Sequence, residues 1–117
     1  MKKVFFIITL AALAVVAVVW QVATGGQPNP ELDSFAQCLT DKGVAMYGAK
    51  WCLHCQNQKK AFGKSFRLIK YLECPDNIEL CLAKDIQGYP TWIINDKKYE
   101  GEISLEELSE ISGCPLL

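Results

Sequence analysis

The stretch KWCLHCQNQKKAFG, residues 50–63, places two cysteines with two residues between them at the start of an expected helix. Such a pair has three explanations: a redox couple, half of a zinc site, or a short structural bridge. At a helix start, unpaired backbone N–H groups and the helix dipole favour the thiolate form of Cys52. Cys55 follows one turn later. A redox pair would therefore use Cys52 as the attacking thiol and Cys55 as the resolving thiol.

The only histidine of the chain, His54, stands between the two cysteines. A protonated imidazole beside a thiolate stabilises the reduced pair and makes the disulfide a stronger oxidant. The alternative is a solvent-exposed helix residue with no part in the chemistry. We expect His54 to tune the couple, because disulfide exchange itself requires only thiolates.

The N-terminal segment differs in composition from the rest of the chain. No charged residue occurs between residues 4 and 23, and about 20 apolar residues span a bilayer. We therefore expect a membrane anchor or signal-anchor over residues 1–23, a linker over 24–31 and one domain over 32–117. The alternative is a signal peptide cleaved after Gly25, which would release a secreted domain.

The distribution of charge predicts where the domain lies and which partners it lacks. Lysines precede the apolar segment and none follows it closely, which predicts a cytoplasmic N-terminus and an extracytoplasmic domain, in a periplasm, at a cell exterior or in an equivalent of the thylakoid lumen. Residues 27–117 carry 13 acidic and 10 basic side chains, a formal charge of −3. No basic stripe with interleaved aromatic residues occurs, so a nucleic-acid partner is not expected.

The domain sequence alternates between helical and strand patterns. Helices are expected at residues 30–43, 52–68, 78–86 and 104–112, and strands at residues 44–49, 71–74, 91–95 and 97–101. The last two strands are joined by Asn95 and Asp96, which favour a hairpin turn. A strand-helix-strand crossover followed by a hairpin predicts an α/β domain with a mixed central sheet and helices on both faces.

The segments YGAKWCLHC, residues 47–55, and IQGYPTWI, residues 86–93, resemble the thioredoxin superfamily, in which a WCxxC helix start faces a loop with a cis proline. The further segments FAQCL, YLEC and YEGEISLEELSEISGC are similar to the thioredoxin-like domain that accompanies bacterial and plant homologues of vitamin K epoxide reductase. The resemblance covers residues 32–114. It implies a thioredoxin-like fold for the domain.

The resemblance also implies roles for residues around Cys52. A cis peptide bond is expected between Tyr89 and Pro90, with the backbone of Tyr89 offered to a bound substrate strand. Trp51 is expected at the edge of the site, and its alternative is an ordinary core aromatic. Two departures stand out: Met46 occupies the position where the superfamily often has a buried acid, and Leu53 replaces the proline usual in the similar domains.

The other four cysteines are expected to form structural disulfides. An even number of cysteines in a small exported domain indicates disulfide bonds, although six cysteines allow 15 pairings. In the fold that the resemblance implies, Cys74 and Cys81 lie at the active-site end, and Cys38 and Cys114 lie at the far end. We therefore expect these two pairs. A further possibility is that the Cys74–Cys81 pair exchanges electrons with the Cys52–Cys55 couple.

The resemblance implies an enzyme, a membrane-tethered thiol-disulfide oxidoreductase whose only redox group is the Cys52–Cys55 disulfide. Its substrates would be exported cysteine-containing proteins, and a separate membrane quinone reductase of the vitamin K epoxide reductase type would reoxidise it. The alternative of the same fold is a disulfide reductase or isomerase. A zinc module that uses Cys52, Cys55, Cys74 and Cys81 is a third hypothesis, but the second pair has six intervening residues where zinc ribbons have about two. We expect no bound metal.

Overall fold

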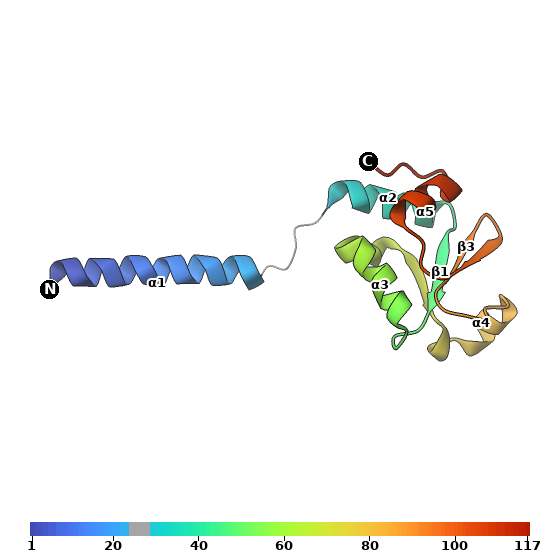
Figure 1. Cartoon of the computed structure of the whole chain (residues 1–117), viewed down its shortest axis with the longest axis horizontal. Coiled ribbons are helices and arrows are strands. Elements are labelled where there is room, and N and C mark those ends of the chain that lie inside the picture. The colour runs from blue at the N-terminus through green and yellow to red at the C-terminus, as the bar shows by residue number, and fades with distance from the viewer. Residues whose placement is uncertain (24–28) are drawn as a thin grey trace.

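The structure, a computed structural model, describes residues 1–23 and 29–117 (Figure 1). Helix α1, Lys2–Ala23, is the one helix among these residues that is long and apolar enough to cross a membrane, with a mean hydropathy of 2.3 over Lys2–Val19. A signal sequence meets the same criteria. The predicted cleavage site at Gly25 and residues 24–28 of the predicted linker lie outside the described residues.

The domain is built on a four-stranded mixed sheet, which confirms the predicted fold class. Its strands are β1 (Ala45–Gly48), β2 (Lys70–Glu73), β3 (Thr91–Ile94) and β4 (Lys97–Glu100), in the order β2-β1-β3-β4. β1 pairs in parallel with β2, whereas β3 is antiparallel to both β1 and β4. The helices that flank the sheet are α2 (Pro30–Asp41), α3 (Leu53–Phe62), α4 (Ile78–Ala83) and α5 (Leu105–Ser112) (Figure 1).

Two hydrophobic clusters pack against the sheet, one on each face. Residues of β1 contribute alternately to the two clusters because successive strand residues point to opposite faces. Met46 joins the larger cluster, whereas Ala45 and Tyr47 join the smaller one. The larger cluster includes the fully buried side chains Phe35, Leu39, Phe62, Trp92, Ile94 and Leu108. Helix α3 is fixed to the sheet through Phe62, whose ring centroid lies 6.1 Å from that of Trp92 in β3, and Phe62 also stacks on Phe35 of α2.

The prediction of one continuous helix over residues 52–68 is wrong. Helix α3 ends at Phe62, and Gly63 adopts a φ of +53°, which glycine tolerates because it has no Cβ. A 3₁₀ helix, Gly63–Leu68, follows. The predicted strand over residues 71–74 also stops one residue early, since Cys74 begins a 3₁₀ turn that contains Pro75, which has no N–H to donate to a sheet.

The local turn signals of the sequence are confirmed. Asn95 and Asp96 have φ values of +50° and +64°, as a two-residue hairpin of the primed type requires. Ser104 caps α5 by accepting the N–H of Glu107 at 3.1 Å, and Gly113 ends the helix with a φ of +72°.

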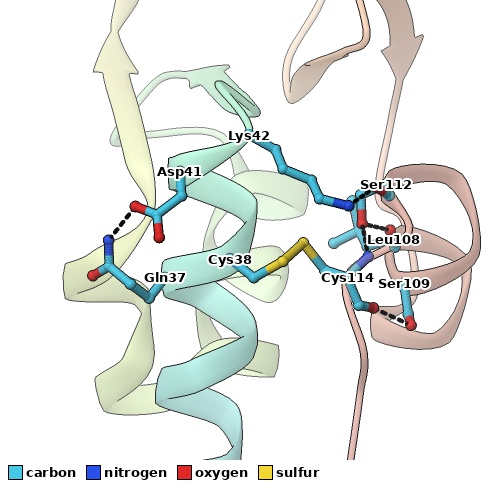
Figure 2. The surroundings of a disulfide bond; sticks show 8 residues. All are labelled: Gln37, Cys38, Asp41, Lys42, Leu108, Ser109, Ser112 and Cys114. Atoms are coloured by element: carbon cyan, nitrogen blue, oxygen red, sulfur yellow. Dashed lines mark hydrogen bonds between the residues drawn. A yellow bond between two sulfur atoms is a disulfide. The ribbon is translucent and has the colours of Figure 1, made fainter.

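A disulfide joins α2 to the segment that follows α5 (Figure 2). Cys38 and Cys114 are bonded at 2.05 Å, and Cys114 is buried. The Lys42 side chain crosses the same gap and donates a hydrogen bond to the backbone oxygen of Ser112 at 2.8 Å. The C-terminal segment is thus fixed to the first helix of the domain by a covalent bond and a charged hydrogen bond.

Candidate active site

Cys52 lies at the N-terminus of α3, where the helix donates a hydrogen bond to its sulfur. It is the N-cap residue of α3, and its Sγ accepts the backbone N–H of Cys55 at 3.2 Å. The Cys52 thiol also donates to the backbone oxygen of Tyr89 at 3.6 Å. Cys52 and Cys55 are both free thiols, and Cys52 keeps 7% of its surface exposed whereas Cys55 keeps none. The sulfur that a second protein can reach is therefore that of Cys52.

The loop that faces Cys52 contains a cis peptide bond between Tyr89 and Pro90. This loop is anchored on both sides of the bond, because the Pro90 oxygen accepts the N–H of Gly101 at 2.8 Å and the Thr91 hydroxyl donates to the Gly88 oxygen at 2.7 Å. The backbone of Tyr89 is consequently held beside the Cys52 sulfur.

Two apolar side chains project into solvent next to Cys52. Trp51 is 72% exposed and lies edge-on to Tyr89, with 5.9 Å between ring centroids. Leu53, the first residue of α3, is 64% exposed. The alternative interpretation of Trp51 as a core aromatic is therefore wrong. Exposed aromatic and aliphatic groups on both sides of a reactive sulfur form a surface that an apolar segment of a protein substrate can cover.

His54 forms an ion pair with Glu102 that the sequence analysis did not predict. Its Nδ1 lies 2.6 Å from Oε1 of Glu102, which also accepts a hydrogen bond from Asn57 at 3.0 Å. These hydrogen bonds, that of His54 foremost, hold the pKa of Glu102 below its usual value. The pair also links the start of α3 to the segment between β4 and α5.

The second active-site sulfur, that of Cys55, is enclosed by the sheet. Burial, together with the contact with Cys52, raises the pKa of Cys55 to about 12. Gly48 makes this packing possible, since a Cβ there would lie 2.9 Å from the Cys55 sulfur and 3.2 Å from the ring of Tyr71. Met46, at the position of the superfamily's buried acid, is fully buried and carries no titratable group.

The remaining cysteine pair lies in the smaller hydrophobic cluster. Cys74 and Cys81 form a disulfide of 2.03 Å, and both are buried beside Tyr47. Cysteines joined in a disulfide cannot also bind a metal as thiolates. Among the described residues, no three His, Cys, Asp or Glu side chains are grouped so that they could hold a metal ion. The four-cysteine zinc hypothesis does not fit this arrangement.

These features define a class of protein: a thioredoxin-like fold with a C-x-x-C dithiol at a helix start, opposite a cis-proline loop. Comparison with known proteins agrees with this class. The chain is 42% identical over 97 residues to "Thiol-disulfide oxidoreductase LTO1" of Arabidopsis thaliana, an alignment that covers 75% of this chain and 26% of that protein. It is 32% identical over 85 residues to "Protein disulfide isomerase-like 2-2" of Oryza sativa subsp. japonica, covering 60% of this chain and 23% of the relative.

A third relative is the "Thioredoxin domain-containing protein 5 homolog" of Drosophila melanogaster, 31% identical over 94 residues, which cover 65% of this chain and 22% of that protein. The chain therefore spans about a quarter of the length of these curated relatives. No protein-family model matches the chain. The fold and the relatives together support membership of the thioredoxin superfamily.

Proposed function

We propose that this protein is a thiol-disulfide oxidoreductase in which Cys52 and Cys55 are the exchanging pair. The observation that carries the proposal is the environment of the Cys52 sulfur, which accepts an N–H at the start of α3 and lies beside the Tyr89 carbonyl on a partly exposed surface. The names of the relatives support the same chemistry, since each aligned protein is named for disulfide exchange or for a thioredoxin domain.

In the proposed oxidation, a substrate thiolate attacks the Cys52 sulfur of the Cys52–Cys55 disulfide. The disulfide breaks, a mixed disulfide forms between substrate and Cys52, and Cys55 leaves as a thiolate that takes up a proton. A second substrate thiolate then attacks the substrate sulfur of the mixed disulfide. The substrate leaves as a disulfide and Cys52 leaves as a thiolate, so two electrons pass from substrate to protein. Trp51 and Tyr89 border the place where the substrate segment would lie.

The direction we propose is oxidation of cysteines in exported proteins. The position of His54 between the two cysteines supports it, because a protonated imidazole next to a thiolate stabilises the reduced pair and so makes the disulfide more oxidising. In this proposal a separate quinone-linked membrane reductase, of the vitamin K epoxide reductase type that the sequence resemblance implies, takes the electrons from the Cys52–Cys55 dithiol. The alternative of the same fold is a reductase or isomerase, which the reduction potential distinguishes.

We further propose that residues 1–23 anchor the protein in a membrane, that residues 24–31 connect it, and that the domain from residue 32 faces an extracytoplasmic space. The length and composition of α1 support the anchor, and the lysines at its start support this orientation. Extraction of membranes with alkaline carbonate, followed by protease treatment from either side, tests both points. A domain that is released by carbonate, or is cleaved from the cytoplasmic side, would contradict them.

The experiment that tests the function is the equilibrium reduction potential of the Cys52–Cys55 pair in the full chain, measured in glutathione buffers in detergent. An oxidase should give a potential of about −120 to −180 mV, whereas about −270 mV is typical of a reductase. Cys52→Ser should abolish exchange with a model dithiol peptide. If the Cys52→Ser variant exchanged as fast as the unchanged protein, the proposed site would be wrong.

Matched variants test the part of the His54–Glu102 pair. His54→Ala removes the imidazole between the two cysteines, and Glu102→Gln removes the carboxylate that pairs with this imidazole. Both variants should therefore shift the reduction potential toward the reducing end. The control is Glu106→Gln, an exposed acid in the first turn of α5. A potential that is the same in all four proteins would show that His54 is an ordinary surface residue.

A further inference from the structure

Two polar residues of β2 lie between the buried thiol and the protein surface. The Tyr71 hydroxyl donates a hydrogen bond to Oε2 of Glu73, and Oε1 of Glu73 accepts the backbone N–H of Lys50 at 2.7 Å. Tyr71 and Glu73 share one face of β2 because they are two residues apart. The parallel register sets Glu73 opposite Gly48 of β1, next to the turn that carries Cys52. The pair is therefore fixed at the active-site end of the sheet.

The hydroxyl of Tyr71 and the sulfur of Cys55 border the same small volume. A Cβ on Gly48 would lie 2.9 Å from the Cys55 sulfur and 3.4 Å from the Tyr71 hydroxyl oxygen. Residue 48 is glycine and places no side chain between the two atoms. Tyr71 and Glu73 are both half-buried, in contrast to the completely buried Cys55. The order from the interior outward is thus Cys55, Tyr71, Glu73.

Cys55 needs such a route because burial raises its pKa to about 12, so the thiol holds its proton at neutral pH. Met46 offers no acid or base at the position used elsewhere in the superfamily. Burial and the bond to Glu73 raise the pKa of Tyr71 as well, which keeps the phenol neutral and suited to pass a proton on. Partial burial raises the pKa of Glu73, but the hydrogen bonds from Tyr71 and the Lys50 backbone outweigh it and bring that pKa below its usual value.

The charged groups around this pair favour movement of a proton outward. Lys59 of α3 places its Nζ 3.8 Å from the centre of the Tyr71 ring, and its charge acts on both Cys55 and Glu73. Lys50 contributes a second positive charge near Glu73 and lies 3.9 Å from Asp76. On the inner side, the Cys52 thiol faces Cys55. Two lysines thus stabilise negative charge on the thiolate and the carboxylate.

We propose that Tyr71 and Glu73 form the proton path of the resolving thiol Cys55, an inference that rests on the proposed exchange function. When Cys55 attacks a mixed disulfide at Cys52, the Cys52–Cys55 bond forms and the Cys52–substrate bond breaks, with the electron pair leaving on the substrate sulfur. The Cys55 proton passes to the Tyr71 oxygen while the Tyr71 proton passes to Glu73, which releases it to water. In the opposite reaction the same path returns a proton to the departing Cys55 thiolate.

The test uses the full chain in detergent, mildly reduced to two free thiols and mixed with 5,5′-dithiobis(2-nitrobenzoate) in a stopped-flow instrument. Attack by Cys52 releases one chromophore, and attack by Cys55 on the resulting mixed disulfide releases the second. Tyr71→Phe and Glu73→Gln should leave the first phase within about two-fold and slow the second at least about 10-fold at neutral pH, a modest value for general acid-base catalysis. Tyr99→Phe on β4 and Glu79→Gln on α4 serve as matched controls.

The pH profile separates proton transfer from a packing effect. The unchanged protein should show a second phase that is nearly level between about pH 6 and 8, since Glu73 is ionised there, whereas in both variants it should rise about 10-fold per pH unit as hydroxide takes over. Imidazole in the buffer should restore the rate of Glu73→Gln but leave that of Tyr71→Phe low, because only the outer acceptor can be replaced from solvent.

The outcomes distinguish the two proposals. Two release phases, with a second phase that Tyr71→Phe and Glu73→Gln leave unchanged, would refute the proton path alone. A slowed second phase with an unaltered pH profile and no rescue by imidazole would also refute it, because packing would then explain the loss. An unchanged protein that releases no chromophore would refute the exchange function, and the proton path with it.

Discussion

Removal of the Cys38–Cys114 disulfide should destabilise the domain by clearly more than removal of the Cys74–Cys81 disulfide. The first bond joins residues 76 apart in sequence and the second joins residues 7 apart. In the chain-entropy description, loops of these lengths correspond to about 4.5 and about 2.4 kcal/mol at 25 °C. Each pair contains a cysteine that is only 1% exposed, so changing either pair to alanine leaves a similar cavity. The cost of the cavity therefore cancels when the two double variants are compared, and the expected difference in unfolding free energy is about 2 kcal/mol.

The assay is urea unfolding of Cys38→Ala/Cys114→Ala and of Cys74→Ala/Cys81→Ala, followed by tryptophan fluorescence with the other disulfide intact. About 2 kcal/mol corresponds to roughly 8–16 °C in melting temperature for a domain of this size. Lys42→Met is a control at the same end, because it removes only the hydrogen bond to Ser112 and should cost about 1 kcal/mol. Equal losses for the two disulfides, or a larger loss for the shorter loop, would refute the loop-length argument.

Three further predictions concern buried and charged groups. Gln58→Leu should cost about 3 kcal/mol in urea unfolding, because it leaves the backbone N–H and oxygen of Ile103 and a buried indole N–H without their partners; a loss under 1 kcal/mol would contradict it. The hydrogen bond from Arg67 holds the pKa of Asp33 at about 2, below the unperturbed 3.8. The stability that this pair adds is therefore present above pH 3.8 and is lost as the pH falls through 2. In Asp33→Asn, the urea midpoint should depend less on pH over that range. The raised pKa of Cys55 means that the reduced protein loses stability as the pH rises from about 9 to 12, a loss that Cys55→Ala should lack.

The features that could be predicted from the sequence are those that depend on neighbouring residues. The hairpin at Asn95 and Asp96 follows from two residues that tolerate positive φ, and the start of α5 follows from Ser104 as a cap. The end of α3 at Gly63 could not be predicted, because Phe66 continues the apolar spacing of a helix beyond that point. In the structure a 3₁₀ helix still packs Phe66 against the core.

The features that could not be predicted depend on side chains brought together by the sheet. Glu102 lies 48 residues from His54 in sequence. The two side chains meet because the fold brings the segment that follows β4 to the start of α3. In the sequence, Tyr71 and Glu73 look like ordinary strand residues. The parallel pairing with β1 sets Glu73 opposite Gly48 and brings Tyr71 to the same glycine as Cys55. A sequence pattern shows which residues share an element, whereas these pairs depend on the register between elements.

The two sulfurs differ in burial and in hydrogen bonding, and these differences support the separate roles that we propose for them. Cys52 keeps 7% of its surface exposed, with the helix N–H and the Tyr89 carbonyl beside it, so in the proposed exchange an incoming sulfur would meet Cys52 first. Cys55 is sealed beneath Gly48 and Tyr71, so it can react only with a partner already bonded to Cys52. Because the proposed exchange proceeds through a mixed disulfide, this asymmetry would give the same order of the two sulfurs in either direction.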